Sequence, residues 1–155
     1  MRATEIVCII DCKNRNELGE YISALSNSAA IEGRKFAYFV WGINDKTHEV
    51  VGTAFNYDQD VNHEPLKHYL RRKCSPDNNF DFKELTIRGK RIVLLTIPAA
   101  KTVPLSFAWE RYIRIGSSKE NFTKIPGKRV LPVRCTQVWA SHTGKYTVRI
   151  SGSDV

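Results

Sequence analysis

The stretch RKFAYFVWGINDKTHEVVGTAF, residues 34–55, decides the fold class, and the rest of the chain supplies its partners. Its first half is apolar at nearly every position, which is typical of a strand buried on both faces in the middle of a sheet. The second half, Glu49 to Phe55, is shorter and β-branched, and Asn44 to His48 supplies turn formers between the two. The stretch therefore predicts a β-hairpin with Asp45 at its tip.

Further strands are predicted on both sides of this hairpin. Thr4 to Asp11 is β-branched and apolar, as a strand requires. Residues 80–88 and 90–99 flank Gly89 as a second hairpin, and the apolar run RIVLLTIPAA within it indicates another central strand. Leu105 to Ile115 alternates well enough to predict one more strand.

Two segments have a helical period instead. The first spans roughly residues 15–30 after Asn14 as a cap, with apolar positions at helical spacing: Leu18, Tyr21, Ile22, Leu25 and Ala29. The second follows Asn62 as a cap, has Pro65 near its start and ends near Cys74. The order of these elements predicts an α+β fold, with a single mixed or antiparallel sheet and about two packed helices.

The chain length of 155 residues fits one domain with an appendage. We expect the domain to occupy residues 1–126 and a basic C-terminal extension to occupy residues 127–155. Breaks at Pro126 and Pro132, turn formers at Ser141 to Gly144, and an alternating basic segment at Lys145 to Ile150 predict a β-hairpin in that extension.

Composition narrows the class of protein. The hydrophobic content of 42% and the charged content of 26% are ordinary for a soluble globular chain. No apolar run approaches the roughly 20 residues of a membrane-spanning helix, and the N-terminus lacks a signal-peptide pattern, so we expect a soluble cytoplasmic protein without membrane partners. Four cysteines without metal-site spacing are expected to be reduced thiols: Cys8, Cys12, Cys74 and Cys135.

Positive charge is concentrated in the last third of the chain. Residues 1–100 hold 14 Lys and Arg against 13 Asp and Glu, whereas residues 101–155 hold 10 against 3, which is +7 of the net +8. Such a basic region favours a polyanion as partner, because each phosphate that is neutralised releases counterions. A merely solubilising surface explains the charge equally well.

Basic and aromatic residues together suggest where a nucleic acid would bind. Cations can hold phosphates while aromatic rings stack on bases. The candidates lie on the last strand, after it and at the end of the second helix: Arg111, Tyr112, Arg114, Lys119, Lys124, Lys128, Arg129, Arg71, Arg72 and Lys73. An edge strand protected by charge, and cations that complement a helix dipole, are the structural alternatives. Of the three tryptophans, which are more often core residues, only Trp109 has basic neighbours.

Several motifs in one order resemble the Schlafen/AlbA-type nucleic-acid-binding domain of bacterial helicase-related and transcriptional-regulator-like proteins. Asp11-Cys12-Lys13 stands where the family has Glu-Phe-Lys, and EYISALSNSAA at 20–30 is similar to its helix. VWGINDKTHEVVGTAF is similar to its hairpin, and IVLLTIPAA followed by RYIRIGSS to its closing strands. The resemblance covers about residues 4–126 and implies a compact α+β domain.

For Schlafen members the resemblance also implies a metal-dependent endoribonuclease that acts on structured RNA such as tRNA. By position, Asp11 and Asp45 would be acids of that site, with Glu5 as the third and Lys13 beside them, and the carboxylates would hold Mg²⁺ or Mn²⁺. Glu5 lies six residues before Asp11, where the family spacing is five, and one residue of offset turns a strand side chain to the other face. Turn and cap roles are the alternatives for these residues.

Three functions follow from the sequence. The first is a nucleic-acid-binding module, expected to be DNA-directed, in a helicase-related or transcription-regulatory protein. The second is the metal-dependent endoribonuclease, and the third is a protein-interaction domain. Whether the chain is an enzyme is left open, since no P-loop or other ATPase motif occurs and no cofactor is expected apart from Mg²⁺ or Mn²⁺ in a nuclease. The sequence leaves the oligomeric state open, with a homodimer as one option.

Overall fold

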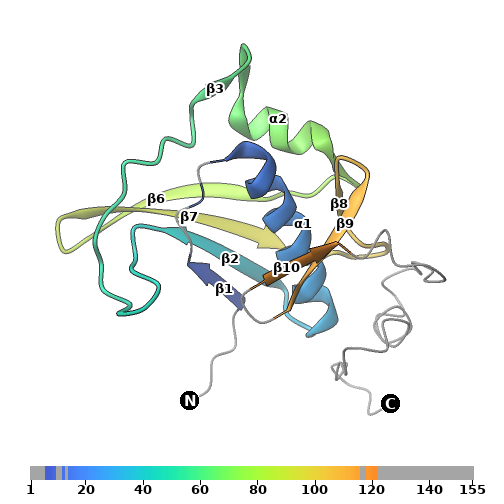
Figure 1. The fold of residues 1–155 in the computed structure, drawn as a ribbon, viewed down its shortest axis with the longest axis horizontal. Helices are drawn as coiled ribbons and strands as arrows, with labels where there is room; N and C mark the ends of the chain where they lie inside the picture. The colour runs from blue at the N-terminus through green and yellow to red at the C-terminus, as the bar shows by residue number, and fades with distance from the viewer. Residues whose placement is uncertain (1–5, 10–11, 13, 116–117, 122–155) are drawn as a thin grey trace.

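Strand β2 (Phe36–Trp41) lies inside the main sheet, as its apolar sequence predicts. In this computed structural model, which describes residues 6–9, 12, 14–115 and 118–121, the sheet has the order β1-β2-β7-β6. β1 (Ile6–Ile9) runs parallel to β2, whereas β7 (Lys90–Pro98) and β6 (Asp81–Ile87) continue the sheet in antiparallel fashion (Figure 1). Both central strands are therefore where the sequence places them.

The prediction that Glu49 to Phe55 forms the partner strand of β2 is wrong. Only an isolated bridge between Ile43 and Val50 forms there, and Val51 is 54% exposed. The reason is that β2 already pairs along its whole length with β7 on one edge and from Ala37 to Val40 with β1 on the other, so neither edge is free for a returning strand. The chain turns away at Gly42, whose φ of 104° is a conformation that favours glycine.

The second predicted hairpin is confirmed. β6 and β7 pair from Asp81 opposite Thr96 to Ile87 opposite Lys90. Arg88 and Gly89 between them both have positive φ, 53° and 75°, as a two-residue turn that matches the twist of the strands requires.

Helix α1 (Arg15–Ile31) is confirmed within one residue of its predicted end. The side chain of Asn14 caps it by accepting hydrogen bonds from the backbone N–H groups of Asn16 and Glu17, at 2.9 and 3.2 Å. The helix lies between two sheets, with β2 and β7 on one side and β9 on the other (Figure 1). Almost every residue from Leu18 onward is buried as a result.

Four buried polar residues on α1 join these two sheets. The Asn27 amide donates to the carbonyls of Leu105 and Tyr112, at 2.9 and 2.8 Å, and accepts from the Leu105 N–H at 2.7 Å. Ser23 donates to the same Leu105 carbonyl, Ser28 accepts from the N–H of Arg114, and Ser26 donates to the carbonyl of Pro98. These side chains supply hydrogen-bond partners for backbone N–H and C=O groups that face helix α1 and not another strand.

A second sheet has the order β10-β9-β8-β5 and is antiparallel. It consists of β5 (Cys74–Ser75), β8 (Ser106–Phe107), β9 (Glu110–Ile115) and β10 (Ser118–Asn121). The single strand predicted for Leu105 to Ile115 is in fact the hairpin β8–β9, because Ala108 and Trp109 adopt left-handed φ values of 50° and 68° and reverse the chain.

Helix α2 (Leu66–Lys73) follows the short hairpin of β3 (Asp60–Val61) and β4 (Glu64–Pro65). The predicted cap at Asn62 is wrong, because Asn62 has a φ of 52° in the turn of that hairpin and Pro65 occupies the cap position. The α+β class is confirmed, with the described strands divided among three sheets where the sequence predicted one.

The core centres on aromatic rings that cover the main sheet. Trp41 stacks on Phe55 with 4.4 Å between ring centroids, and its indole N–H donates to the Cys12 carbonyl at 2.8 Å.

Cys12 and Cys74 are free and buried, and burial raises the pKa of both thiols to about 12, so they stay protonated at neutral pH. Neither described helix is long and apolar enough to cross a membrane.

Candidate nucleic-acid interface

The C-terminal end of α2 and the tip of the β8–β9 hairpin are held together. The backbone N–H of Ala108 donates to the carbonyl of Lys73 at 2.9 Å, and the strand pair of Cys74 with Phe107 continues directly from it. The carbonyl is one of those left without a helical partner where α2 ends. The hairpin tip is therefore fixed next to the last turn of the helix, which carries Arg71, Arg72 and Lys73.

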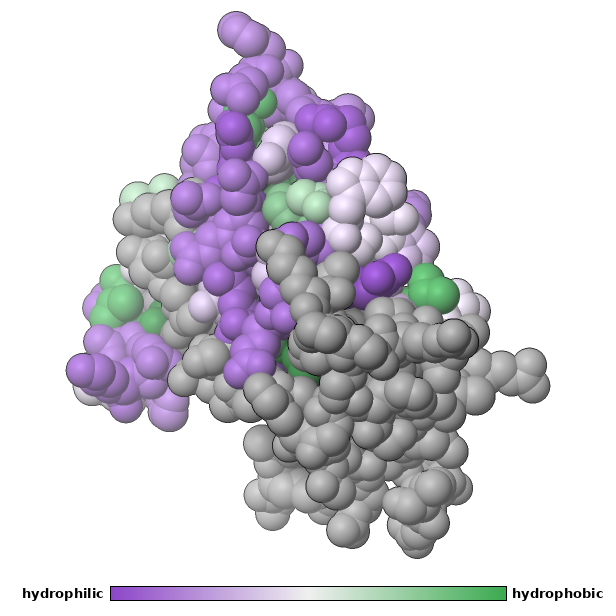
Figure 2. Space-filling model, turned by 45° about the vertical axis from the view of Figure 1, so that its right-hand side comes forward, coloured by the Kyte–Doolittle hydropathy of each residue, from purple (hydrophilic) through white to green (hydrophobic). Residues whose placement is uncertain are grey.

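Trp109 stands at this tip with 86% of its surface exposed. Its indole is by far the most exposed of the large hydrophobic side chains that the structure describes. Figure 2 turns the β8–β9 side forward and shows a mainly hydrophilic surface with small apolar patches. A large ring held in water on a fixed two-residue turn is available to stack on another planar group.

Two cations lie beside the exposed indole. A hollow of about 170 Å³ is lined by Arg72, Lys73, Ser75, Ala108 and Trp109. Positive charge next to a free aromatic face is the combination by which single-stranded nucleic acids are held, with phosphates on the cations and bases on the ring. We call these three residues, Arg72, Lys73 and Trp109, the Trp109 site.

The Arg72 side chain is oriented by its neighbours. Its Nε donates to one carboxylate oxygen of Glu64 at 3.0 Å and a terminal nitrogen donates to the other at 2.9 Å, while the guanidinium lies 5.6 Å from the centre of the Tyr69 ring. Hydrogen bonding from Arg72, with a further contribution from His68, lowers the pKa of Glu64 to about 2. Arg72 is thus a positioned cation that is still 52% exposed.

Lys73 is the less constrained cation of the site. Its ammonium lies 5.9 Å from the centre of the Tyr69 ring, and within the described ranges it has no ion pair. Arg71, by contrast, packs over Phe80 at 5.7 Å and reaches the Phe80 carbonyl at 3.5 Å. Arg71 therefore anchors α2 on the main sheet, although the sequence groups it with its two neighbours.

Two of the binding residues predicted on the last strands face helix α1. Tyr112 is only 8% exposed, and its hydroxyl, which has one hydrogen to donate, lies 3.0 and 2.9 Å from carboxylate oxygens of Glu20 and Glu110. Burial and these two carboxylates raise the pKa of Tyr112. The Lys119 ammonium lies 3.1 Å from Glu20 and 5.0 Å from the centre of the Tyr21 ring. Although partial burial opposes the charge, the bond to Glu20 raises the pKa of Lys119.

The remaining basic candidates divide into two groups. Arg111 and Arg114 are half-buried on β9, and the backbone N–H of Arg114 is bound by Ser28 at 2.9 Å. Lys124, Lys128 and Arg129 lie outside the described residues. The structure therefore brings Arg72 and Lys73 together with Trp109 and ties Tyr112 and Lys119 to α1.

The predicted nuclease residues are only partly described. Asp45 is exposed in the loop after β2, where the side chain of Asn44, not that of Asp45, accepts the turn hydrogen bonds from Lys46 and Thr47 at 2.9 and 3.0 Å. Glu5, Asp11 and Lys13 lie outside the described residues. Among the residues that are described, no three His, Cys, Asp or Glu gather as a metal would need, so they do not by themselves supply a donor set for Mg²⁺ or Mn²⁺.

Comparison with known proteins decides the family. The family described as Schlafen, AlbA_2 matches residues 8–124, which is most of the chain. This chain belongs to the Schlafen/AlbA_2 family. Membership suggests a function related to nucleic acids. Residues 8–124 include α1, α2, the β10-β9-β8-β5 sheet, the main sheet apart from the first two residues of β1, and the whole Trp109 site.

The chain is also similar to solved structures. The chain is similar to the crystal structure of the DIP2311 protein from Corynebacterium diphtheriae, at 16% identity and a TM-score of 0.48, over 76% of this chain and 24% of that one. This Schlafen/AlbA_2 chain thus spans about a quarter of that protein's length. No curated protein matches it.

The sequence pointed less clearly to Trp109 than to the cations. Trp41 is a core residue, 1% exposed, as expected of most tryptophans, and Trp139 lies outside the described residues. Trp109 of this Schlafen/AlbA_2 chain differs from Trp41 in being exposed. Its exposure depends on the Ala108-Trp109 turn, and neither residue type is a usual turn former, so only the basic neighbours gave a signal.

Proposed function

We propose that this Schlafen/AlbA_2 domain binds nucleic acid with unpaired bases, using the Trp109 site. Trp109 stacks on a base while Lys73 and Arg72 contact the phosphates that flank it. The observation that carries the proposal is the 86% exposure of Trp109 on a fixed turn beside two cations. Stacking of one base on such a ring contributes about 1–3 kcal/mol and is tolerant of sequence.

The rigidity of the site supports this role. The hydrogen bond from Ala108 to Lys73 ties the turn to α2, and the paired bonds of Glu64 hold Arg72 in place. Little side-chain entropy is then lost when a base and a phosphate dock, because two of the three groups are already ordered. A solubilising surface would require neither an exposed indole nor an oriented guanidinium.

The nucleic acid that we propose is DNA, in its single-stranded form, and the domain would bring a helicase-related or transcription-regulatory protein to it. Stacking on Trp109 requires a base that is out of its duplex, and double-stranded DNA presents none without paying for unpairing. Exposed loops of structured RNA satisfy the same requirement, so RNA is the comparison that the experiment must include.

The test is fluorescence anisotropy with labelled single-stranded DNA, duplex DNA and tRNA at a series of salt concentrations. We expect the single strand to bind more tightly than the duplex, and its affinity to fall steeply between about 50 and 200 mM salt, because phosphate contacts release counterions. Lys73→Glu should weaken binding by about tenfold or more.

Lys83→Glu is the matched control for charge, because Lys83 is an exposed lysine on β6 that does not line the hollow at Trp109. It should lower the affinity much less than Lys73→Glu. Equal effects of the two variants would mean that overall charge, and not this site, controls binding. No binding of any of the three probes at low salt would reject the nucleic-acid function and leave the protein-interaction reading.

A further inference from the structure

A third cation lies close to the Trp109 site, at the first residue of helix α1. The guanidinium of Arg15 lies 5.0 Å from the centre of the Tyr69 ring. Arg72 and Lys73 approach the centre of the same ring to 5.6 and 5.9 Å. The Tyr69 side chain, which is only 9% exposed, therefore connects a cation of α1 with the two cations of α2.

Helix α2 runs from beside the start of α1 to the tip of the β8–β9 hairpin (Figure 1). The Tyr69 hydroxyl donates to the side chain of Asn16 in the first turn of α1, at 2.7 Å. Lys73 belongs to both groups of residues, because it borders the Tyr69 ring and lines the hollow at Trp109. A strand that lies on the indole therefore has only one tyrosine ring to cross before it meets Arg15.

The charge of Arg15 is not compensated as the charge of Arg72 is. Within the described part of the chain Arg15 forms no ion pair, although its side chain is half-buried. Both of its terminal nitrogens lie 3.2 Å from the side-chain oxygen of Asn62, with that amide oriented to accept them. Asn62 thus orients the guanidinium through two hydrogen bonds but brings no negative charge.

The position of Arg15 in the helix also opposes its charge. A cation at the first residue of α1 meets the positive end of the helix dipole. Contact with the Tyr69 ring offsets part of this cost, but two more cations border the same ring. Among the described residues, Glu64 is the one carboxylate bound to any of the three cations, so positive charge remains in excess. A bound anion would neutralise it.

We infer that Arg15 binds a further phosphate of the strand whose base stacks on Trp109. The ligand of this surface is then a strand with several consecutive phosphates. Arginine suits this role because its planar guanidinium donates parallel hydrogen bonds to phosphate oxygens, and Asn62 leaves N–H donors free for them. The inference rests on the proposed function and adds to it a contact from α1.

The test is the salt dependence of binding, measured by fluorescence anisotropy with a labelled thymidine octanucleotide. Each phosphate contact of a single strand contributes about 0.7 to the slope of the logarithm of the binding constant against the logarithm of salt concentration. Arg15→Gln removes one charge, so it should make this slope shallower by about 0.7 and weaken binding about tenfold at low salt. Arg15→Lys keeps the charge and should keep the wild-type slope.

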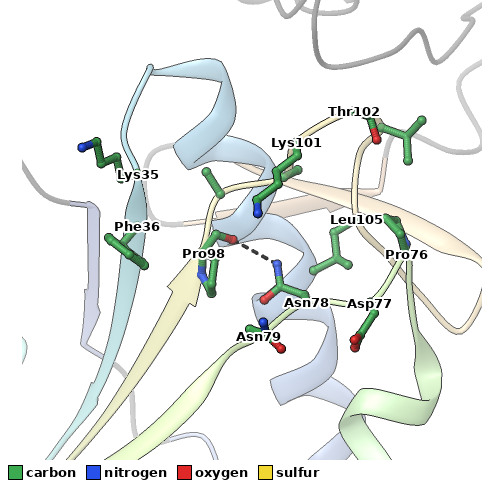
Figure 3. Close-up of a pocket in the computed structure, with 13 residues that line it drawn as sticks. Lys35, Phe36, Pro76, Asp77, Asn78, Asn79, Pro98, Lys101, Thr102 and Leu105 are labelled. Atoms are coloured by element: carbon green, nitrogen blue, oxygen red, sulfur yellow. Dashed lines mark hydrogen bonds between the residues drawn. The ribbon is translucent and has the colours of Figure 1, made fainter.

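Two control variants separate this contact from an effect of overall charge. Arg88→Gln removes the same charge from the exposed turn between β6 and β7. Lys101→Gln removes a charge from a separate pocket of about 640 Å³, whose lining shares no residue with the hollow at Trp109 (Figure 3). Both variants should keep the wild-type slope.

Thermal unfolding checks that Arg15→Gln, which loses its contact with the Tyr69 ring, is folded. If it is not, Asn62→Gly takes its place, because glycine accepts the φ of 52° in this turn and lacks the amide that orients Arg15. Asn62→Gly should weaken binding of the octanucleotide about threefold, and an unchanged affinity would then contradict the inference.

The inference is overturned if Arg15→Gln keeps the wild-type slope, or if Arg15→Lys or either control variant makes the slope shallower by as much. In those cases weaker binding by Trp109→Ala would leave the proposed function intact. An unchanged affinity in Trp109→Ala would instead reject the proposed function, and with it the continuation of the strand from Trp109 to Arg15.

Discussion

At the scale of single residues, the site depends on how neighbours hold two side chains. Trp109 is exposed because the backbone around it reverses direction between β8 and β9, and Arg72 is oriented because Glu64 binds it through both carboxylate oxygens. Paired bonds of this kind favour the ionised carboxylate, so the same contact that positions Arg72 also makes Glu64 sensitive to acid.

The pH dependence of Glu64 has a definite sign. Its pKa is 4.5 without partners and about 2 in the folded protein, so the stability that it contributes is fully present above pH 4.5 and is lost as the pH falls toward 2. Glu64→Gln should therefore be less stable than the wild type above pH 4.5 and equally stable near pH 2. Urea unfolding of both proteins across this range measures the difference. A difference that does not change with pH would show that Glu64 is not held as described.

At the scale of elements, side chains of helix α1 form hydrogen bonds to strand backbone, as a neighbouring strand would in a sheet. Asn27 makes three hydrogen bonds to the backbone of Leu105 and Tyr112, all of them buried. Its neighbours Ser23 and Ser28 extend the contact along β9. The polar residues of the EYISALSNSAA segment are therefore explained by the sheet that they hold.

Asn27→Ala removes these bonds; the Leu105 carbonyl keeps its bond from Ser23, whereas the Leu105 N–H and the Tyr112 carbonyl lose the bonds that Asn27 makes to them. We expect it to lower the free energy of unfolding by about 2–4 kcal/mol. Chemical denaturation of the variant measures this. Asn79→Ala, which truncates an exposed asparagine, should change stability by less than about 0.5 kcal/mol. Similar values for both variants would contradict the connecting role of α1.

Gly19→Ala tests the contact between α1 and β8. Alanine is favoured over glycine inside a helix by about 1 kcal/mol, but a Cβ at this position would lie 2.1 Å from Cε1 of Phe107. Overpacking costs about 1–3 kcal/mol, so we expect net destabilisation.

Phe107→Leu in the same chain should remove part of the Gly19→Ala penalty, since the smaller side chain leaves room. A double-mutant cycle by thermal unfolding measures this coupling. A stabilised Gly19→Ala variant, or the absence of coupling with Phe107→Leu, would show that α1 and β8 are not packed as closely as described.

The elements that the sequence predicted correctly are those that local pattern determines. The apolar positions of α1 recur at 3.6 residues, and the β6–β7 hairpin has Gly89 in its turn, so both were predicted. The segment after Gly42 was wrongly predicted as a strand, because β1 occupies the edge of β2 with which that strand would have paired. Pairing between distant segments is not visible in local periodicity.

At the scale of the whole molecule, the predicted basic surface separates into residues with different tasks. Arg71 packs α2 against Phe80, and Tyr112 and Lys119 connect the second sheet to α1. Among the candidates that the structure describes, Arg72 and Lys73 line the hollow at the exposed indole. Composition located the cations but could not tell which of them pack against α1 or the main sheet and which lie beside the exposed indole. That distinction comes from the tertiary structure.

The central claim is that a base stacks on Trp109, and its most direct test is the tryptophan fluorescence of the protein when single-stranded DNA is added. We expect quenching in the wild type, and its loss in Trp109→Phe, which keeps a ring and should still bind. Trp109→Ala should bind more weakly by about 1–3 kcal/mol. Quenching that persists undiminished in Trp109→Phe, or an unchanged affinity in Trp109→Ala, would contradict the account.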